Sequence, residues 1–143
     1  MLKNISSIIS PELLKILCEM GHGDEIVLAD SNFPAKSVSN GHQFVRADGI
    51  SVPELLEAIL LFFPLDTYDA ESFMLMDVVE GDPIPEIWSR YSEILAAHEP
   101  SCHITYIERF AYYERAKKAY AVIATGETAS YANVILKKGI VPI

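Results

Sequence analysis

Residues 10–30 read SPELLKILCEMGHGDEIVLAD, and this stretch contains one helix-to-strand unit of the pattern on which the fold rests. Ser10 can cap a helix, Pro11 suits its first turn, and apolar residues then recur at helical spacing up to a glycine. Residues 25–29 follow as an apolar run of strand length, and Asp30 comes directly after them. The stretch therefore predicts a helix, a tight turn and a short buried strand that ends at a carboxylate.

The same alternation continues to the end of the chain. Further strands are predicted over residues 72–79, 104–107, 120–125 and 131–136, and further helices over residues 52–63, 84–95 and 110–119. Residues 31–50 are predicted to form an irregular polar loop with a short strand at Phe44 and Val45. Short apolar strands separated by helices predict an α/β fold of three layers, with a mainly parallel sheet and helices on both faces. The length predicts a single domain over residues 1–143.

The composition argues against several classes of protein. Half of the residues are hydrophobic and the mean hydropathy is +0.21, which does not suit a disordered chain. The longest apolar run, residues 58–65, is far shorter than the ~20 residues of a membrane-spanning helix. The formal net charge is −9, without a basic stripe, which makes nucleic acid a poor partner. We therefore expect a globular protein that binds neither membranes nor nucleic acid.

The cysteines and the first residues bear on the compartment. Cys18 and Cys102 make no disulfide framework, and the apolar helical pattern around Cys18 predicts a reduced, buried thiol. Residues 1–10 are too polar for the apolar core of a secretion signal. A cytoplasmic location is therefore expected.

In parallel α/β sheets, ligands bind beyond the carboxyl ends of the strands, so polar residues there are the first candidates for a site. Asp30 ends the first predicted strand, and His22 precedes that strand between two glycines. A carboxylate can orient an imidazole and tune its pKa, so the two could form an acid/base pair. The alternatives are a loop histidine without a role and a carboxylate that caps the following loop.

Three further residues have side chains suited to binding hydroxyl groups. Arg109 follows the predicted strand over residues 104–107 and offers a planar fork, although a surface ion pair is the alternative. Tyr131 and Asn133 are two residues apart, so an extended backbone would place their phenol and amide on one face. An edge strand with two exposed polar residues is the alternative there. Asp77 interrupts an apolar run and has no assigned role.

The common cofactor and metal motifs are absent from the sequence. It contains no G-x-G-x-x-G, no P-loop, no C-x-x-C and no H-E-x-x-H pattern. Nothing therefore predicts a nucleotide cofactor or a bound zinc ion, and we expect a site without cofactor or metal.

Short motifs follow one another along the chain: GHGDEI from residue 21, FPA from 33, RADG from 46, EGD from 80, RFA from 109, YERA from 113, TGE from 125, YAN from 131 and LKKG from 136. This ordered set resembles the RbsD/FucU family of sugar mutarotases. The set covers nearly the whole chain. The glycine after His22, the FPA loop and the arginine at position 109 resemble the family's fucose branch. The ribose branch typically has a threonine after the histidine and a histidine near position 109.

The resemblance implies a reaction and a role for each candidate. It makes His22 the general acid. The sugar-binding positions that it implies are Asp30, Arg109, Tyr131, Ala132 and Asn133. The implied reaction interconverts the α and β anomers of L-fucose by opening and reclosing the sugar ring, without cofactor or metal. The alternatives are a D-ribose pyranase of the same family and a sugar-binding regulatory module without catalysis.

The resemblance also implies a homo-oligomer, commonly a ring-shaped decamer, with active sites near the subunit boundaries. Such an assembly would use the apolar excess of this chain, because subunit interfaces as well as the core need apolar residues. The tail over residues 140–143 is a candidate contact of this kind.

Overall fold

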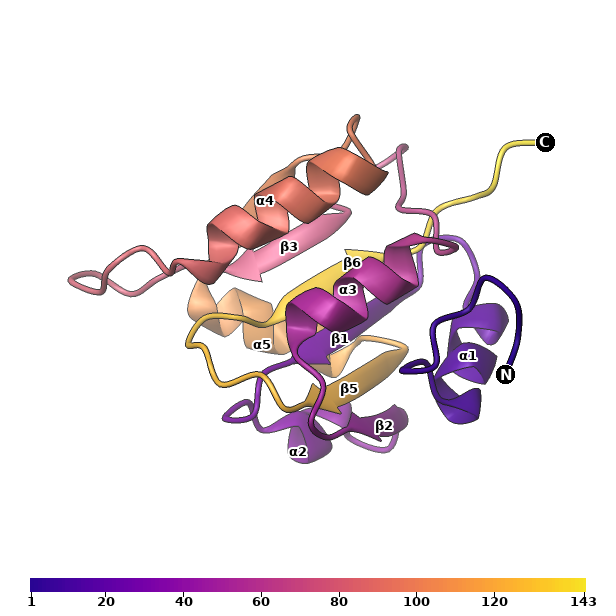
Figure 1. Cartoon of the computed structure of the whole chain (residues 1–143). Helices are drawn as coiled ribbons and strands as arrows, with labels where there is room; N and C mark the ends of the chain where they lie inside the picture. Colours follow the sequence, from indigo (N-terminus) through magenta and orange to yellow (C-terminus); the bar gives the residue numbers. More distant parts are fainter.

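Six strands form one mixed sheet, and five helices cover it on both faces (Figure 1). The computed structural model describes all residues 1–143. In chain order the elements are α1 (Pro11–Glu19), β1 (Glu25–Ala29), α2 (Ala35–Ser39), β2 (Gln43–Ala47), α3 (Val52–Leu60), β3 (Phe73–Met76), α4 (Ile87–His98), β4 (Ile104–Ile107), α5 (Arg109–Lys117), β5 (Ala121–Thr125) and β6 (Val134–Lys137).

The strand order is β2-β5-β1-β6-β3-β4. Strands β1 to β5 all run in one direction, and β6 lies antiparallel between β1 and β3. The prediction of a mainly parallel sheet is confirmed, with β6 as the exception. The carboxyl ends of the five parallel strands and the amino end of β6 therefore share one edge of the sheet, which we call the carboxyl edge. The opposite edge is the amino edge.

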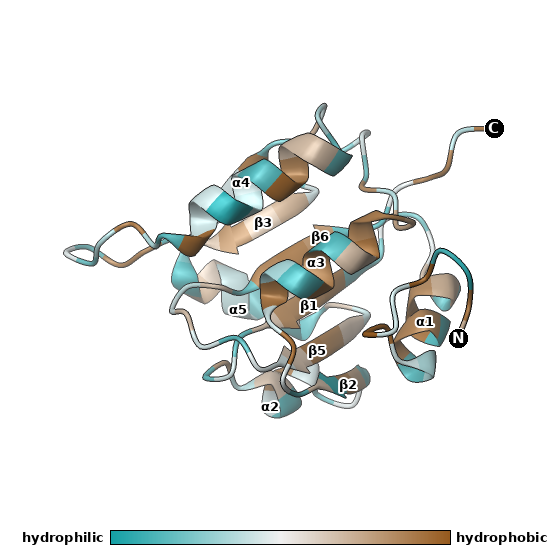
Figure 2. Ribbon diagram, viewed as in Figure 1, coloured by the Kyte–Doolittle hydropathy of each residue, from teal (hydrophilic) through white to brown (hydrophobic).

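Side chains of the central strands alternate between two separate cores. Ile26 and Leu28 of β1 pack in the core beneath α1, α3 and α4, whereas Val27 and Ala29 pack in the core beneath α2 and α5. Strands β3, β5 and β6 divide their side chains in the same way. Because both faces are covered, these strands are apolar apart from Glu25, Thr125 and Lys137 at their ends, and they are drawn largely brown in Figure 2. The predicted three-layer arrangement is confirmed.

The two helix starts that were predicted from capping residues are confirmed. The Ser10 hydroxyl accepts the Leu13 N–H at the start of α1. At the start of α3, Ser51 and Glu54 form a complete capping box. Such caps satisfy N–H groups that have no partner within the helix, so the sequence locates these boundaries well.

The short strand predicted at Phe44 and Val45 is confirmed as the middle of β2, but the prediction of an irregular loop over the rest of residues 31–50 is wrong, because this segment contains α2 and a longer β2. No side chain caps the start of α2, which is one short helix of five residues ending at Asn40 with a left-handed φ of 44°. Strand β2 lies at an edge of the sheet and carries Gln43 and Arg46, so it lacks the apolar pattern of a buried strand. Both elements form where the local signals are weak.

The prediction of a buried thiol at Cys18 is also wrong, because this residue is exposed. Helix α1 turns Leu13, Ile16 and Leu17 toward the core. Each residue advances about 100° around the helix axis, which carries the position after Leu17 out toward solvent. Cys18 and the half-buried Cys102 are both free thiols.

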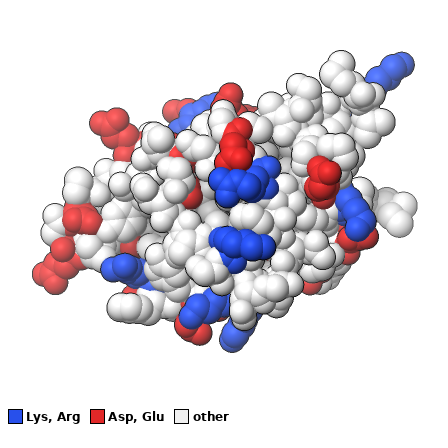
Figure 3. Space-filling model, turned by 90° about the horizontal axis from the view of Figure 1, so that it is seen from below, with Lys and Arg blue, Asp and Glu red and all other residues white.

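The surface combines mixed charge with several exposed apolar side chains. Figure 3 shows acidic and basic residues interspersed on the face seen there. None of the helices has the combined length and hydropathy that a membrane span requires. The exposed large apolar side chains include Tyr68, Phe110, Ile140 and Val141. The last two belong to the C-terminal tail, which extends away from the sheet in Figures 1 and 2.

Candidate active site

A pocket of about 400 Å³ opens at the carboxyl edge of the sheet. It is lined by Asp30, Asn32, Phe33, Met76, Val79, Asp82, Arg109, Tyr113, Ser130, Tyr131 and Asn133. Four of the predicted site residues, from the ends of β1 and β4 and the start of β6, therefore meet in one cavity. Ala132, the fifth, is fully buried between two of them and offers only its backbone.

Asp30 follows β1 directly and is buried, with 6% of its surface exposed. Its Oδ1 accepts the N–H groups of Asn32 (3.0 Å) and Phe33 (2.9 Å), so it does cap the following loop, while also lining the pocket. Burial raises the pKa of Asp30 above its ordinary value, although these N–H groups act in the opposite direction. A carboxylate held out of water in this way is a strong acceptor for a ligand hydroxyl.

Asn133 is oriented by the backbone of β1. Its Oδ1 accepts the Asp30 N–H at 2.8 Å, and the residue is 5% exposed. Because the amide oxygen is taken, the Nδ2 hydrogens are the part available to the Asp30 carboxylate or to a ligand hydroxyl. The pair therefore presents an acceptor and a donor side by side.

Tyr131 reaches the pocket for a different reason from the predicted one. Its backbone is left-handed, with φ of 54°, and β6 begins only at Val134, so Tyr131 and Asn133 do not share the face of a strand. A left-handed conformation costs roughly 1–2 kcal/mol in a non-glycine residue. Two bonds from α4 hold it: Trp88 Nε1–H donates to the Tyr131 carbonyl (2.9 Å) and the Tyr91 hydroxyl donates to the Ala132 carbonyl (2.7 Å).

Replacing Trp88 with Phe should loosen this segment. The change removes the bond to the Tyr131 carbonyl, and we expect the free energy of unfolding to fall by about 1–3 kcal/mol because a partly buried acceptor loses its donor. Affinity for the pocket ligand should fall as well, measured by titration alongside denaturant unfolding. Tyr106→Leu is the matched control, because it removes the ring packed 4.9 Å from Trp88 and keeps the bond. Unchanged ligand affinity in Trp88→Phe would contradict this role of α4.

Arg109 is the first residue of α5 and makes no salt bridge within the chain. Its neighbour Glu108 caps the helix instead, accepting the Phe110 and Ala111 N–H groups, both at 3.0 Å. These bonds lower the pKa of Glu108. The Arg109 guanidinium lies 6.0 Å from the centre of the Tyr113 ring, at the wall of the pocket. Its donors are therefore free for a ligand.

The structure does not bring His22 and Asp30 together within one chain. His22 precedes β1 at the amino edge, whereas Asp30 follows β1 at the carboxyl edge. The four residue steps of the strand alone separate them by ~13 Å. His22 is therefore absent from the pocket that holds the other predicted residues.

At the amino edge His22 has a different acidic partner, Asp66. His22 Nε2 lies 3.0 Å from Asp66 Oδ1, and the ring packs against Tyr68. Burial opposes ionisation of Asp66, but hydrogen bonds from His22 and the Tyr68 N–H hold the pKa of Asp66 below its ordinary value. The ionised carboxylate therefore accepts the Nε2 hydrogen, and Nδ1 keeps no partner within the chain. The imidazole side chain is 45% exposed.

The end of β6 holds these two residues in place. The Gly23 N–H donates to the Lys138 carbonyl (2.8 Å), and the Asp66 N–H donates to the Lys137 carbonyl (3.0 Å). Gly139 allows the close approach, because a Cβ there would lie 2.4 Å from a carbonyl oxygen of the facing segment. His22 and Asp66 are 44 positions apart in the sequence, so no spacing rule could have found this partner.

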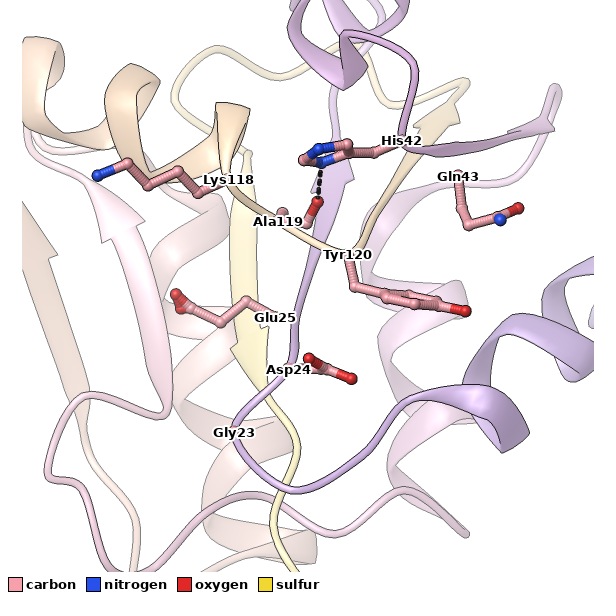
Figure 4. Close-up of a pocket in the computed structure, with 8 residues that line it drawn as sticks. All are labelled: Gly23, Asp24, Glu25, His42, Gln43, Lys118, Ala119 and Tyr120. Atoms are coloured by element: carbon pink, nitrogen blue, oxygen red, sulfur yellow. Dashed lines mark hydrogen bonds between the residues drawn. The ribbon is translucent and has the colours of Figure 1, made fainter.

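A second hollow, of about 410 Å³, lies at the amino edge near His22. Figure 4 shows its lining residues, Gly23, Asp24, Glu25, His42, Gln43, Lys118, Ala119 and Tyr120. Several of its polar groups already have partners: His42 Nδ1 bonds the Ala119 carbonyl (2.7 Å), and the Glu25 carboxylate bonds Arg115 (2.7 Å). The carboxyl-edge pocket, with its free arginine and its carboxylates, is therefore the better candidate for a ligand site.

Fold and site together define a class: a three-layer α/β protein whose polar pocket at the carboxyl edge suits a small, hydroxyl-rich ligand. No three or more His, Cys, Asp or Glu side chains converge where they could hold a metal ion. Comparison with known proteins then places the chain more narrowly. It belongs to the RbsD / FucU transport protein family, whose model matches residues 3–141.

Individual relatives match the chain over nearly its whole length. It is 56% identical to the fucose mutarotase of Danio rerio, over 99% of this chain and 95% of that protein. The fucose mutarotase of Streptococcus pneumoniae, solved in complex with L-fucose, is 54% identical with a TM-score of 0.93, covering 99% of this chain and all of that one. FucU from Bifidobacterium longum is 52% identical with a TM-score of 0.94, covering 98% and 100%.

Proposed function

We propose that this chain is an L-fucose mutarotase, an isomerase that interconverts the α and β anomers of L-fucose without a cofactor. The observation that carries the proposal is the carboxyl-edge pocket, where Asp30, Arg109, Tyr131 and Asn133 meet. Its support from relatives is identity of 54–56% over whole chains to fucose mutarotases, one of them bound to L-fucose.

The chemistry of anomer exchange suits such a pocket. The reaction breaks the bond between the anomeric carbon and the ring oxygen, turns the carbonyl end and closes the ring on the other face. The ring oxygen must gain a proton while the anomeric hydroxyl loses one, and no electron transfer is involved. In this proposal Asp30 and Asn133 hold sugar hydroxyls together with the Ala132 backbone, and Arg109 fixes the sugar in the pocket.

The proton donor in this proposal is His22 of a second subunit. Within one chain, His22 lies at the wrong edge of the sheet, so its exposed Nδ1 can reach a sugar only in the pocket of another copy. Exposed apolar side chains flank both halves: Phe110 adjoins Arg109 at the pocket, and Tyr68 packs on His22. Burying these surfaces against each other would bring the His22 imidazole to a sugar-filled pocket.

A ring-shaped homo-oligomer, a decamer in our proposal, would repeat this contact in every subunit and leave no half-site unpaired. The exposed tail residues Ile140 and Val141 would be covered in the same assembly. The cytoplasmic location inferred from the sequence remains a prediction.

The proposed function is tested by measuring anomer exchange directly. Saturation-difference NMR on L-fucose, with and without the protein, should show exchange well above the buffer rate, and D-ribose measured side by side should exchange more slowly. Faster exchange between the pyranose and furanose forms of ribose would favour the ribose alternative. Sugar binding without any acceleration would identify a non-catalytic binding module.

A further inference from the structure

The proposed reaction leaves one step without a residue, namely removal of the proton from the anomeric hydroxyl. Two carboxylates line the carboxyl-edge pocket, Asp30 and Asp82. Asp82 belongs to the loop between β3 and α4, which projects beyond the rest of the fold in Figure 1. In the sequence it belongs to the motif EGD, and no site role is predicted for it.

Asp82 forms a short hydrogen bond inside this pocket. The Tyr131 hydroxyl donates to Asp82 Oδ2 at 2.5 Å. The other contact of that phenol oxygen is the Val79 N–H, at the long distance of 3.4 Å. With its own hydrogen directed at Asp82 and one lone pair accepting the Val79 N–H, the phenol oxygen has one lone pair left for the pocket, so it can face a sugar as an acceptor.

Both ends of this pair are held in place. Tyr131 is fixed from its backbone by Trp88, as described above. Asp82 closes a turn in which its N–H donates to the Val79 carbonyl at 3.1 Å. The turn requires Gly81, whose φ of +94° is one that side-chain-bearing residues rarely adopt. Because the turn positions Asp82 and the bond from Trp88 positions Tyr131, the fold holds both partners of this hydrogen bond in a defined geometry.

Asp30 is less suited to the same step. Its Oδ1 is already occupied by two backbone N–H groups, and it has no hydroxyl partner through which a proton could pass. Asp82, in contrast, receives an O–H donor. The hydrogen bond to Asp82 raises the pKa of Tyr131, against a smaller opposite effect of the Val79 N–H, so the resting phenol keeps its proton.

We propose that Asp82 is a positioning residue that acts through Tyr131 and makes this phenol the acceptor for the proton of the anomeric hydroxyl. This inference rests on the proposed function. As the sugar O–H bond breaks, its proton passes to the Tyr131 oxygen while the phenol proton passes to the Asp82 carboxylate. The anomeric carbonyl forms, the bond to the ring oxygen breaks, and that oxygen takes the proton from His22. Ring closure reverses each transfer.

The test compares Asp82→Asn with Asp82→Glu and Tyr131→Phe in the full-length protein, with fucose as the probe. Asp82→Asn keeps the shape but can donate to Tyr131, so kcat should fall about 10²-fold with KM changed less than about 3-fold. Asp82→Glu should recover part of kcat. The double variant Asp82→Asn/Tyr131→Phe should be no slower than the slower single variant, because the two residues act as one unit.

Each result bears on a definite part of the proposal. Asp82→Asn with wild-type kcat, a change confined to KM, or additive losses in the double variant would overturn it. Melting temperature and oligomer size, measured for every variant, separate these results from misfolding. If the wild-type protein itself does not accelerate fucose exchange, the proposed function falls and this inference falls with it, whereas full activity in Asp82→Asn overturns the inference alone.

Discussion

Mixed oligomers built from His22→Gln and Asp30→Asn chains should regain about a quarter of the wild-type exchange rate, since each site would draw its two halves from different chains. Each variant alone should lose most of the activity: His22→Gln removes the proton donor, an effect of about 10²-fold or more. The reason for recovery is the separation of the two residues across β1, which allows a site to combine the intact pocket of one chain with the intact histidine of another.

The two variants would be co-expressed with different tags and purified on both, so that every oligomer assayed contains both chains. NMR of fucose anomers gives the rate. Mixtures of His22→Gln with His22→Ala serve as the control and should stay inactive, because no chain supplies a histidine. If doubly purified oligomers show no recovery, His22 acts on the pocket of its own chain or not at all, and the shared site is refuted.

Asp30→Asn should weaken fucose binding by about 10- to 100-fold, because a ligand hydroxyl loses a charged acceptor. The same change should stabilise the fold at neutral pH. Asn keeps an oxygen for the Asn32 and Phe33 N–H groups, but no longer places a buried carboxylate in the pocket. A residue that lowers stability while it serves binding is typical of a ligand site.

The sign of the pH dependence follows from the pKa of Asp30. Burial raises it above the ordinary value of 3.8, which the unfolded chain retains, so the folded state holds the proton more tightly. The wild type therefore loses stability as pH rises from 3.8 through the folded pKa, and Asp30→Asn does not. Unfolding measured from about pH 3 to 7 should show a stability gain that is absent in acid and complete at neutral pH.

Asp66→Asn is the matched control for this experiment. The pKa of Asp66 is held below its ordinary value, so its ionised form adds stability above pH 3.8 that is lost as the pH falls. Asp66→Asn should therefore be less stable than the wild type at neutral pH, the opposite of Asp30→Asn. If Asp30→Asn instead destabilises the protein at neutral pH, the hydrogen bonds to the Asp30 carboxylate fully offset the cost of its burial, and the prediction is wrong.

Much of the fold follows from local patterns. The start of α1 at Pro11 and the bounds of β1 and β4 match the prediction, because capping residues and short apolar runs encode them directly. The sequence did not predict α2 and predicted only the middle of β2, because their own residues carry weak signals and contacts with β5 decide their structure. The antiparallel direction of β6 is likewise decided by its pairing with β1 and β3, and its own residues do not encode it.

Some residues of the candidate site also follow from local sequence patterns, whereas others depend on tertiary contacts. By itself the sequence determined the strand ends, and with them Asp30 and Arg109, because residues after parallel strands share one edge whatever the details of packing. The opposite positions of His22 and Asp30 also follow from the bounds of β1, but tertiary structure alone decided that His22 pairs with Asp66 and that Tyr131 bonds Asp82. These pairs lie 44 and 49 residues apart, and contacts over such separations depend on strand order and loop closure, which no local pattern encodes.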